Sequence, residues 1–230
     1  MKEIFSNHSI SIYLENIGPL ETNVGFIVDR VSQQVAVIDA PPGIWDLLQT
    51  HPLLCQWTPA HLLITHGHWD HMTDAFHFAE HHIPLWAGEA DAFCLQHPEI
   101  MTAFGIDMHD ISPCAADRFM EDGKVYEIFP SPSLALQAFH VPGHSPGSFA
   151  YYFPSASLAF VGDTLFAGGV GRSDLPGGQK SLLFQSIRQK LYTLPQQTII
   201  IPGHGPLTSI AREKQSNPYV GPISIPHRES

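Results

Sequence analysis

Four apolar runs in this 230-residue chain each end beside a glycine and at least one histidine or aspartate. The runs cover residues 61–64, 134–141, 158–161 and 198–201. Short apolar runs of this kind are typical of buried strands, and the glycines let the backbone turn closely where each strand ends. The pattern therefore predicts buried strands whose terminal loops carry nitrogen and oxygen ligands.

The first of these loops, residues 66–71, holds three imidazoles and one carboxylate, which are costly to bury unless something binds them. His66 and His68 lie two residues apart in near-extended backbone and are predicted to point to one side. Asp70 and His71 lie where the chain turns into a predicted helix, so this pair aims elsewhere. One tetrahedral ion would not need two such pairs, whereas two adjacent ions would use one pair each. The spacing therefore favours a dinuclear metal site.

Three later residues extend the candidate ligand set. His144 follows the second run, Asp163 the third and His204 the fourth, each directly after a glycine. Seven such residues at strand ends are hard to explain by chance. The other histidines, such as His77 and His97, are interpreted as solvated helix or loop residues.

The H-x-H-x-D-H motif at 66–71, followed in order by the three later residues, resembles that of the metallo-β-lactamase superfamily. The segments 162–166 (GDTLF) and 168–178 (GGVGRSDLPGG) are similar to those of the glyoxalase II group, the hydroxyacylglutathione hydrolases, and within it to a short, single-domain bacterial subgroup. The resemblance runs from about residue 10 to residue 219. It implies an α+β fold, the four-layer αβ/βα sandwich.

The resemblance also implies two divalent ions, with Zn²⁺ expected and iron or manganese as alternatives. A hydroxide shared by the two ions would be the nucleophile, and Asp70 is assigned a catalytic role beside its role as a ligand. The implied ligands are His66, His68 and His144 on the first ion, Asp70, His71 and His204 on the second, and Asp163 bridging both. Many lactamases of the superfamily carry cysteine or another residue at the bridging position, so Asp163 disfavours lactam hydrolysis.

Two further residues each have two open interpretations. Asp39 follows the apolar run 35–38. The family places an aspartate here that orients a ligating histidine. An aspartate that only forms the turn before Pro41 explains the sequence equally well. Arg172 occupies the basic position of the glutathione site and could clamp a carboxylate, or it could form an ordinary loop ion pair with Asp174. Asp174 stands where that family has a tyrosine, and only 26 residues follow His204, so the added helical domain that holds glutathione is not expected.

The leading functional hypothesis is hydrolysis of a small-molecule thioester of the S-2-hydroxyacylglutathione type. The runner-up is persulfide dioxygenation with one Fe²⁺ on His66, His144 and Asp163. A lactone or phosphodiester hydrolase on the same site is a third reading, and a non-catalytic binding module is the weakest.

Composition limits the partners. The formal net charge is −11, with 11 basic and 22 acidic residues, which argues against a nucleic-acid partner. No run approaches ~18 apolar residues and the N-terminus has no apolar leader, so no membrane contact is expected. Three cysteines without paired spacing favour reduced thiols and a cytoplasmic location. The oligomeric state stays open.

The expected organisation is one hydrolase domain at 1–220 with a flexible tail at 221–230. Strands are predicted near 10–14, 24–29, 34–39, 61–65, 83–87, 125–129, 134–140, 148–153, 157–162 and 198–201. Helices are predicted near 44–55, 71–80, 89–96, 179–193 and 208–215, and 97–123 is predicted to be an irregular surface excursion.

Overall fold

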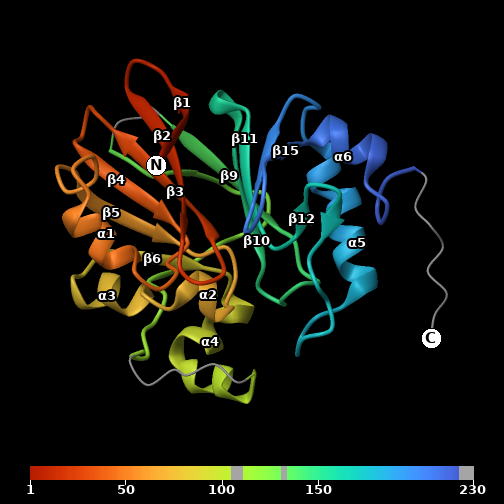
Figure 1. Cartoon of the computed structure of the whole chain (residues 1–230), viewed down its shortest axis with the longest axis horizontal. Helices are drawn as coiled ribbons and strands as arrows, with labels where there is room; N and C mark the ends of the chain where they lie inside the picture. Colours follow the sequence, from red (N-terminus) through yellow and green to blue (C-terminus); the bar gives the residue numbers. More distant parts are fainter. Residues whose placement is uncertain (105–110, 131–133, 223–230) are drawn as a thin grey trace.

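The computed structural model describes residues 1–104, 111–130 and 134–222, and it consists of two sheets packed face to face with helices on both outer sides (Figure 1). This arrangement is the predicted four-layer αβ/βα sandwich, and the prediction of an α+β fold is confirmed. Of the predicted tail at 221–230, only residues 221 and 222 lie among the described residues.

The first sheet has seven strands in sequence order, antiparallel from β1 to β4 and parallel from β4 to β7. The apolar run of β3 is buried along its whole length because one face packs between the sheets and the other against helices. The strands are β1 (Lys2–Ser6), β2 (Ile10–Ile17), β3 (Thr22–Asp29), β4 (Gln34–Ile38), β5 (Thr58–Leu63), β6 (Leu85–Ala87) and β7 (Arg118–Phe119).

The second sheet has six strands in the order β15-β14-β11-β10-β9-β8, and only the pair β11·β14 is parallel. A separate two-stranded ribbon, β12 (Leu165–Phe166) and β13 (Gly169–Val170), follows β11. The sheet strands are β8 (Val125–Glu127), β9 (Ala135–His140), β10 (Phe149–Phe153), β11 (Leu158–Gly162), β14 (Ile199–Pro202) and β15 (Thr208–Ser209).

Three apolar cores hold the layers together. The central core lies between the sheets, where Ile27 and Ile38 meet Tyr151 and Phe160. The outer cores place helices α1 and α3 on the first sheet and α5 and α6 on the second (Figure 1). The α-helices are α1 (Ile44–Thr50), α2 (Trp69–Met72), α3 (Ala75–Glu80), α4 (Ala92–Gln96), α5 (Lys180–Gln189) and α6 (Ile210–Ser216); the 3-10 helices are η1 (Glu89–Asp91), η2 (Pro98–Phe104), η3 (Pro154–Ala156) and η4 (Leu191–Thr193).

Two predicted helices are shorter than expected for physical reasons. The helix predicted over 44–55 ends at Thr50 because His51 precedes Pro52, which disfavours the helical conformation at residue 51. The helix predicted over 71–80 is split into α2 and α3 at Asp74, whose backbone N–H bonds to Ala40 O instead of continuing a helix.

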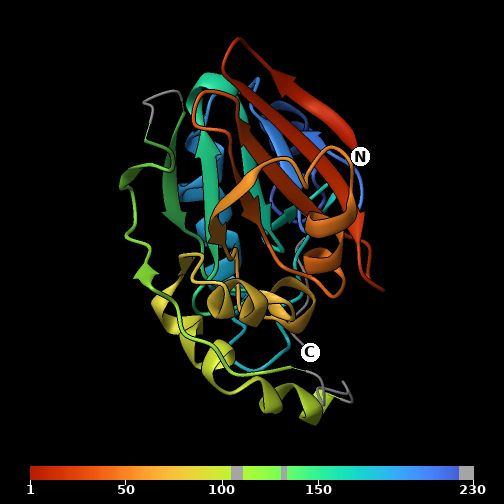
Figure 2. The same cartoon turned by 90° about the vertical axis from the view of Figure 1, so that its left-hand side faces the viewer.

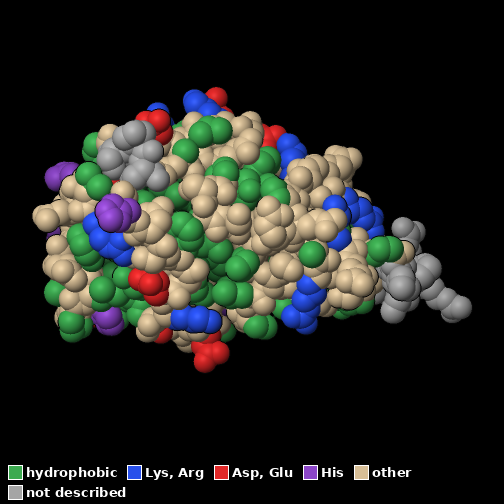
Figure 3. All heavy atoms as spheres, turned by 90° about the horizontal axis from the view of Figure 1, so that it is seen from above, with side chains coloured by type: hydrophobic (Ala, Val, Ile, Leu, Met, Phe, Trp, Pro, Cys, Tyr) green, Lys and Arg blue, Asp and Glu red, His purple; other side chains and the backbone are tan. Residues whose placement is uncertain are grey.

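The remaining differences are short elements. The excursion predicted at 97–123 contains η2 and β7, and its residues 105–110 lie outside the described residues. The predicted helix 179–193 is α5 followed by the 3-10 turn η4, and β1, β12, β13 and β15 were not predicted. No helix in the described part of the chain is both long and apolar enough to span a bilayer. On the face shown in Figure 3, Lys and Arg side chains are dispersed and do not gather into one patch.

The two sheets join near the end of the molecule where α2 and α4 lie (Figure 2). There the segment after β5 bonds to the second sheet, because Phe149 N donates to Thr65 O at 2.8 Å and the Tyr151 hydroxyl donates to Ile64 O at 2.6 Å. These bonds bring the loop at 66–71 against the strand ends of the opposite sheet.

Candidate metal centre

All seven predicted ligands meet at this end of the two sheets. The loops after β5, β9, β11 and β14 carry His66 and His68, His144, Asp163 and His204, while Asp70 and His71 start helix α2. Their ligand atoms form three overlapping groups, each within 4.8 Å: His66, His68 and His144; His66, His71 and Asp163; and Asp70, His71 and His204. The first and last groups match the two sets that the family resemblance implies.

His144 and His204 present the same ring atom to the centre because their other ring nitrogen forms a hydrogen bond outside it. His144 Nδ1 donates to Arg172 O at 2.7 Å, and His204 Nδ1 donates to Leu20 O at 2.9 Å. A carbonyl oxygen can only accept, so both rings carry hydrogen on Nδ1 and offer the lone pair of Nε2 inward.

His71 is oriented by Asp39, whose Oδ2 accepts from His71 Nδ1 at 2.7 Å. The same carboxylate accepts from Thr65 N at 2.7 Å and Thr65 Oγ1 at 2.8 Å, and His66 Nδ1 lies 3.1 Å from that hydroxyl. Asp39 thus contacts one candidate ligand directly and a second through Thr65. Of its two open interpretations, the contacts favour the orientation of a histidine.

The nitrogen separations fit metal ions. His66 Nε2 lies 3.2 Å from His144 Nε2, and His71 Nε2 lies 3.3 Å from His204 Nε2. Two nitrogens that bind one tetrahedral ion at 2.0–2.1 Å are separated by about 3.3 Å. Lone pairs facing one another at this distance repel unless a cation lies between them, so each pair is spaced as ligands of one ion.

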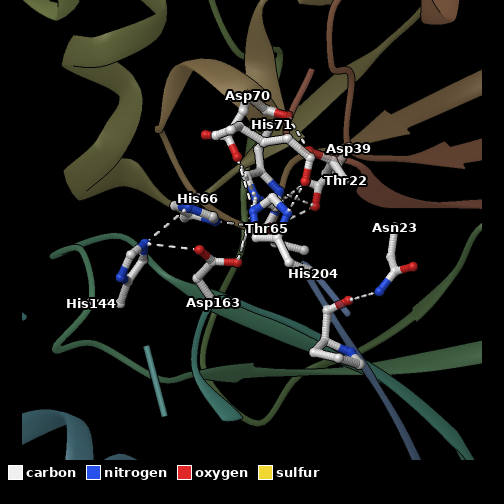
Figure 4. Close-up of polar contacts among 12 residues, drawn as sticks. Thr22, Asn23, Asp39, Thr65, His66, Asp70, His71, His144, Asp163 and His204 are labelled. Atoms are coloured by element: carbon white, nitrogen blue, oxygen red, sulfur yellow. Dashed lines mark hydrogen bonds and ion pairs between the residues drawn. The ribbon is translucent and has the colours of Figure 1, made fainter. Parts of the chain in front are cut away.

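Asp163 lies between the two pairs (Figure 4). Its Oδ1 is 3.5 Å from His71 Nε2 and 3.6 Å from His204 Nε2, while Oδ2 is 3.7 Å from His144 Nε2. Oδ1 is buried and has no hydrogen-bond partner within the described part of the chain. A buried carboxylate oxygen without a donor is unfavourable unless a cation satisfies it, so the residues present fit two divalent ions bridged by Asp163.

The electrostatics prepare these groups for metal binding. Burial, with the neighbouring histidines, lowers the pKa of His68 to about 4 and that of His66 well below its ordinary value. Burial alone would raise the pKa of Asp163, but His71, His144 and His204 outweigh it and hold the pKa at about 2. At neutral pH His66 and His68 are therefore neutral imidazoles and Asp163 is an ionised carboxylate, the forms that bind metals.

The second ligand group differs, because burial lowers the pKa of His204 but the hydrogen bond with Asp70 and the charge of Asp163 outweigh it and raise that pKa, and the pKa of His71 is raised more strongly. Burial lowers the pKa of His71, but the negative charges of Asp39 and Asp70 outweigh burial and raise the pKa well above its ordinary value. The same concentration of carboxylates that favours a proton on His71 favours a divalent cation in its place.

A cavity of about 590 Å³ opens onto the centre, within the size range of small-molecule sites. Its walls are largely apolar, and among the described residues Arg172 is the only Lys or Arg that lines it. Arg172 forms a bidentate pair with Asp174, with Nε–Oδ1 and Nη2–Oδ2 distances of 2.8 Å, and both side chains are exposed. The apolar lining residues include Leu20, Trp69, Ile100, Leu175 and Pro176.

Several residues at the centre were not predicted from the sequence. Thr22 Oγ1 donates to Asp70 O at 3.0 Å, and Asn23 Nδ2 donates to Pro202 O at 2.8 Å and Gly205 O at 2.9 Å, which anchors the loop of His204 to β3. Thr65 directly precedes the candidate ligand His66, and this adjacency is the only sequence signal that could have pointed to a role for Thr65 at the centre. Thr22 and Asn23 lie more than forty residues before the ligands, and only the tertiary fold brings them near.

Residues 17–204 match the sequence model of the metallo-beta-lactamase superfamily. The probable metallo-hydrolase YqgX of Bacillus subtilis is 32% identical over 210 residues, which are 91% of this chain and 97% of that protein. The hydroxyacylglutathione hydrolase GloC of Haemophilus influenzae is 38% identical over 163 residues, which are 69% of this chain and 74% of that protein.

Solved structures give the same fold. The BLEG-1 B3 metallo-beta-lactamase has a TM-score of 0.80 and 32% identity, covering 91% of this chain and 99% of its own. TTHA1623, in a di-iron-bound form, has a TM-score of 0.75 and 31% identity, covering 90% and 99%. ETHE1 from Myxococcus xanthus has a TM-score of 0.74 and 26% identity, covering 91% and 84%.

Proposed function

This chain belongs to the metallo-β-lactamase superfamily and is a metal-dependent hydrolase, and we propose that it hydrolyses thioesters of the hydroxyacylglutathione type at a dinuclear centre. The observation that carries the proposal is Asp163, whose two oxygens face two separate groups of inward-pointing histidines. The similarity to the hydroxyacylglutathione hydrolase of Haemophilus influenzae supports the thioester as substrate.

Two ions held by these residues would lower the pKa of bound water from about 15.7 to about 7 and polarise the substrate carbonyl. The chain itself holds the ligands in place: Asp39 and the carbonyls of Arg172 and Leu20 orient three imidazoles before substrate arrives. Asp70 Oδ2, 3.0 Å from His204 Nε2, faces the cavity from the second group. A thiolate leaves without prior protonation, because thiols ionise near pH 8.5, so the cavity needs no dedicated acid.

The test is a substrate panel on protein loaded separately with zinc, iron or manganese. We expect S-lactoylglutathione to have the highest kcat/KM among a thioester, a lactone, a phosphodiester and a β-lactam. The β-lactam is included because BLEG-1, a B3 metallo-beta-lactamase, is structurally similar. No thioester turnover combined with turnover of another ester would overturn the proposal. The di-iron form of TTHA1623 is the reason to include iron.

Persulfide dioxygenation at one Fe²⁺ is the second candidate, and the ETHE1 neighbour is compatible with it. Of the three ligands it needs, His144 Nε2 lies 3.2 Å from His66 Nε2 and 3.7 Å from Asp163 Oδ2. One iron per chain together with oxygen consumption on glutathione persulfide would decide for this candidate.

The ion pair of Arg172 with Asp174 leads to a prediction about substrate charge. Asp174→Asn should release the guanidinium for a substrate carboxylate and lower KM for S-lactoylglutathione by about two- to fivefold, since exposed ion pairs are weak. The kcat value should not change, because both side chains are exposed and lie outside the ligand groups. Steady-state kinetics with an anionic and an uncharged thioester measure the effect.

Arg172→Ala is the matched variant, and it should raise KM for the anionic thioester alone. Equal changes with both substrates would mean that Arg172 forms only the loop ion pair.

A further inference from the structure

We propose that Asp91 is a positioning residue that sets the separation between the loop of His66 and His68 and the loop of His144. The proposal rests on the metal centre proposed above. Asp91 ends the 3-10 helix η1, before α4, and the residue is 3% exposed. It is not a candidate ligand, because it belongs to none of the three ligand groups.

The carboxylate of Asp91 joins two loops from different sheets. Its Oδ2 accepts from Gly67 N at 2.8 Å and from Ser145 Oγ at 2.6 Å, and its Oδ1 accepts from Gly147 N at 2.6 Å. Gly67 lies between His66 and His68, and Ser145 follows His144 directly. Hydrogen bonds to an ionised carboxylate are short and about twice as strong as neutral ones, so this link is stiff.

The backbone of both loops packs directly on Asp91. A Cβ atom at residue 147 would lie 2.5 Å from Asp91 N and 2.6 Å from Asp91 Cγ, and one at residue 67 would lie 3.0 Å from Asp91 Cβ. Neither glycine has the positive φ that only glycine adopts easily. At residue 147 the need for glycine therefore comes from the space that Asp91 occupies, whereas at residue 67 it comes from Asp91 together with Cys94, whose Cβ would lie 2.9 Å away.

The link matters because metal ligands tolerate little movement. The 3.2 Å between His66 Nε2 and His144 Nε2 is set by two loops that Asp91 connects, and a functional metal site holds its distances to about 0.2 Å. Asp91→Asn keeps the shape of the side chain but leaves one acceptor oxygen for three donors. In either orientation of the amide, the backbone N–H of Gly67 or that of Gly147 then loses its acceptor.

The other ligand group is held by different contacts. Asp39 orients His71, Leu20 O orients His204, and Thr22 binds the backbone of Asp70. None of these three contacts involves Asp91. The proposal therefore predicts that loss of Asp91 weakens one ion of the two, whereas a general loss of stability would weaken both.

The experiment is a stepwise removal of Zn²⁺ by a colorimetric chelator from the loaded full chain. For Asp91→Asn we expect one ion to be released at about 10- to 100-fold lower chelator concentration, with the other released as in the wild type. Loading with Co²⁺ should show altered ligand-field bands for one ion. Ser145→Ala removes one of the three hydrogen bonds to Asp91, together with the hydrogen bond between Ser145 Oγ and Ser148 Oγ. It should shift the same step by a smaller factor and is the variant to use if Asp91→Asn does not fold.

Asp29→Asn is the matched control. Asp29 is also fully buried and also accepts from a backbone N–H and a serine hydroxyl, Val31 N at 3.0 Å and Ser32 Oγ at 2.8 Å. It lies at the other end of β3 from Thr22, about 24 Å away by the rise of the strand. Both ions should be released from this variant as in the wild type, even if its Tm falls.

Unchanged release from Asp91→Asn, or equal weakening of both ions, would overturn the proposal. A wild-type protein that binds no ion would instead contradict the proposed metal centre. Metal analysis of the wild type shows this before any variant is compared.

Discussion

Asp163→Asn is expected to lower kcat/KM by at least about three orders of magnitude, well beyond the 10- to 100-fold that residues behind the ligands typically contribute. The reason is that Asp163 Oδ1 and Oδ2 face different histidine groups, so one substitution removes the charge that both ions share. The bound metal should fall below two ions per chain. Metal analysis and steady-state kinetics on the same preparation measure both effects.

Asp117→Asn is the control for this prediction. Asp117 accepts a backbone hydrogen bond from Leu85 N at 2.8 Å and belongs to none of the ligand groups. It should retain two ions and wild-type kinetics. An Asp163→Asn protein that keeps both ions and normal turnover would contradict the bridging role.

Gly203→Ala is expected to have the second largest effect, although it adds only a methyl group. That Cβ atom would lie 2.1 Å from Asp163 Oδ1 and 2.8 Å from His71 Cε1. The backbone cannot move away easily, because Gly203 N donates to Gly162 O at 2.8 Å and Gly203 O accepts from Asn23 N at 2.7 Å. Asp163 must therefore turn, and we expect metal loss, an activity loss of about 100-fold or more, and destabilisation by about 1–3 kcal/mol from overpacking.

Gly169→Ala is the control, because it makes the same glycine-to-alanine substitution at a position where the added methyl group has room. A Cβ atom there would meet only Phe166 Cβ at 3.6 Å, an ordinary contact, and its φ is not positive. This variant should match the wild type in metal content, and its Tm should stay within a few degrees. A Gly203→Ala protein with two ions and normal turnover would show that the centre tolerates displacement of Asp163.

The ligand set could be predicted from the sequence because its signals are local: His144, Asp163 and His204 each follow an apolar run and a glycine, and the other four ligands lie within the six residues 66–71. Asp39 could be named but not assigned, since its partners Thr65 and His71 lie 26 and 32 residues later. For Arg172 the sequence allows two interpretations, and the structure supports parts of both, because Arg172 lines the cavity while paired with Asp174. Asp91 gave no signal, because its partners come from two loops that only the tertiary fold brings together.

The layers of the fold were also predictable, whereas several boundaries were not. Long apolar strands such as β3 and β4 carry a strong pattern, but β12, β13 and β15 have two residues each and are defined only by their partners. The break at Asp74 likewise depends on a tertiary contact, because its carboxylate accepts from Gly43 N and Trp45 N.

Leu20 and Arg172 each serve the centre in two separable ways. Their side chains line the cavity, while their backbone carbonyls orient His204 and His144. A carbonyl survives any substitution of the side chain it belongs to, so the cavity wall can change in size and charge while the imidazoles keep their orientation. Substrate range in such a protein can diverge by point mutation without a loss of reactivity at each step, which makes these two positions natural starting points for evolving new specificities.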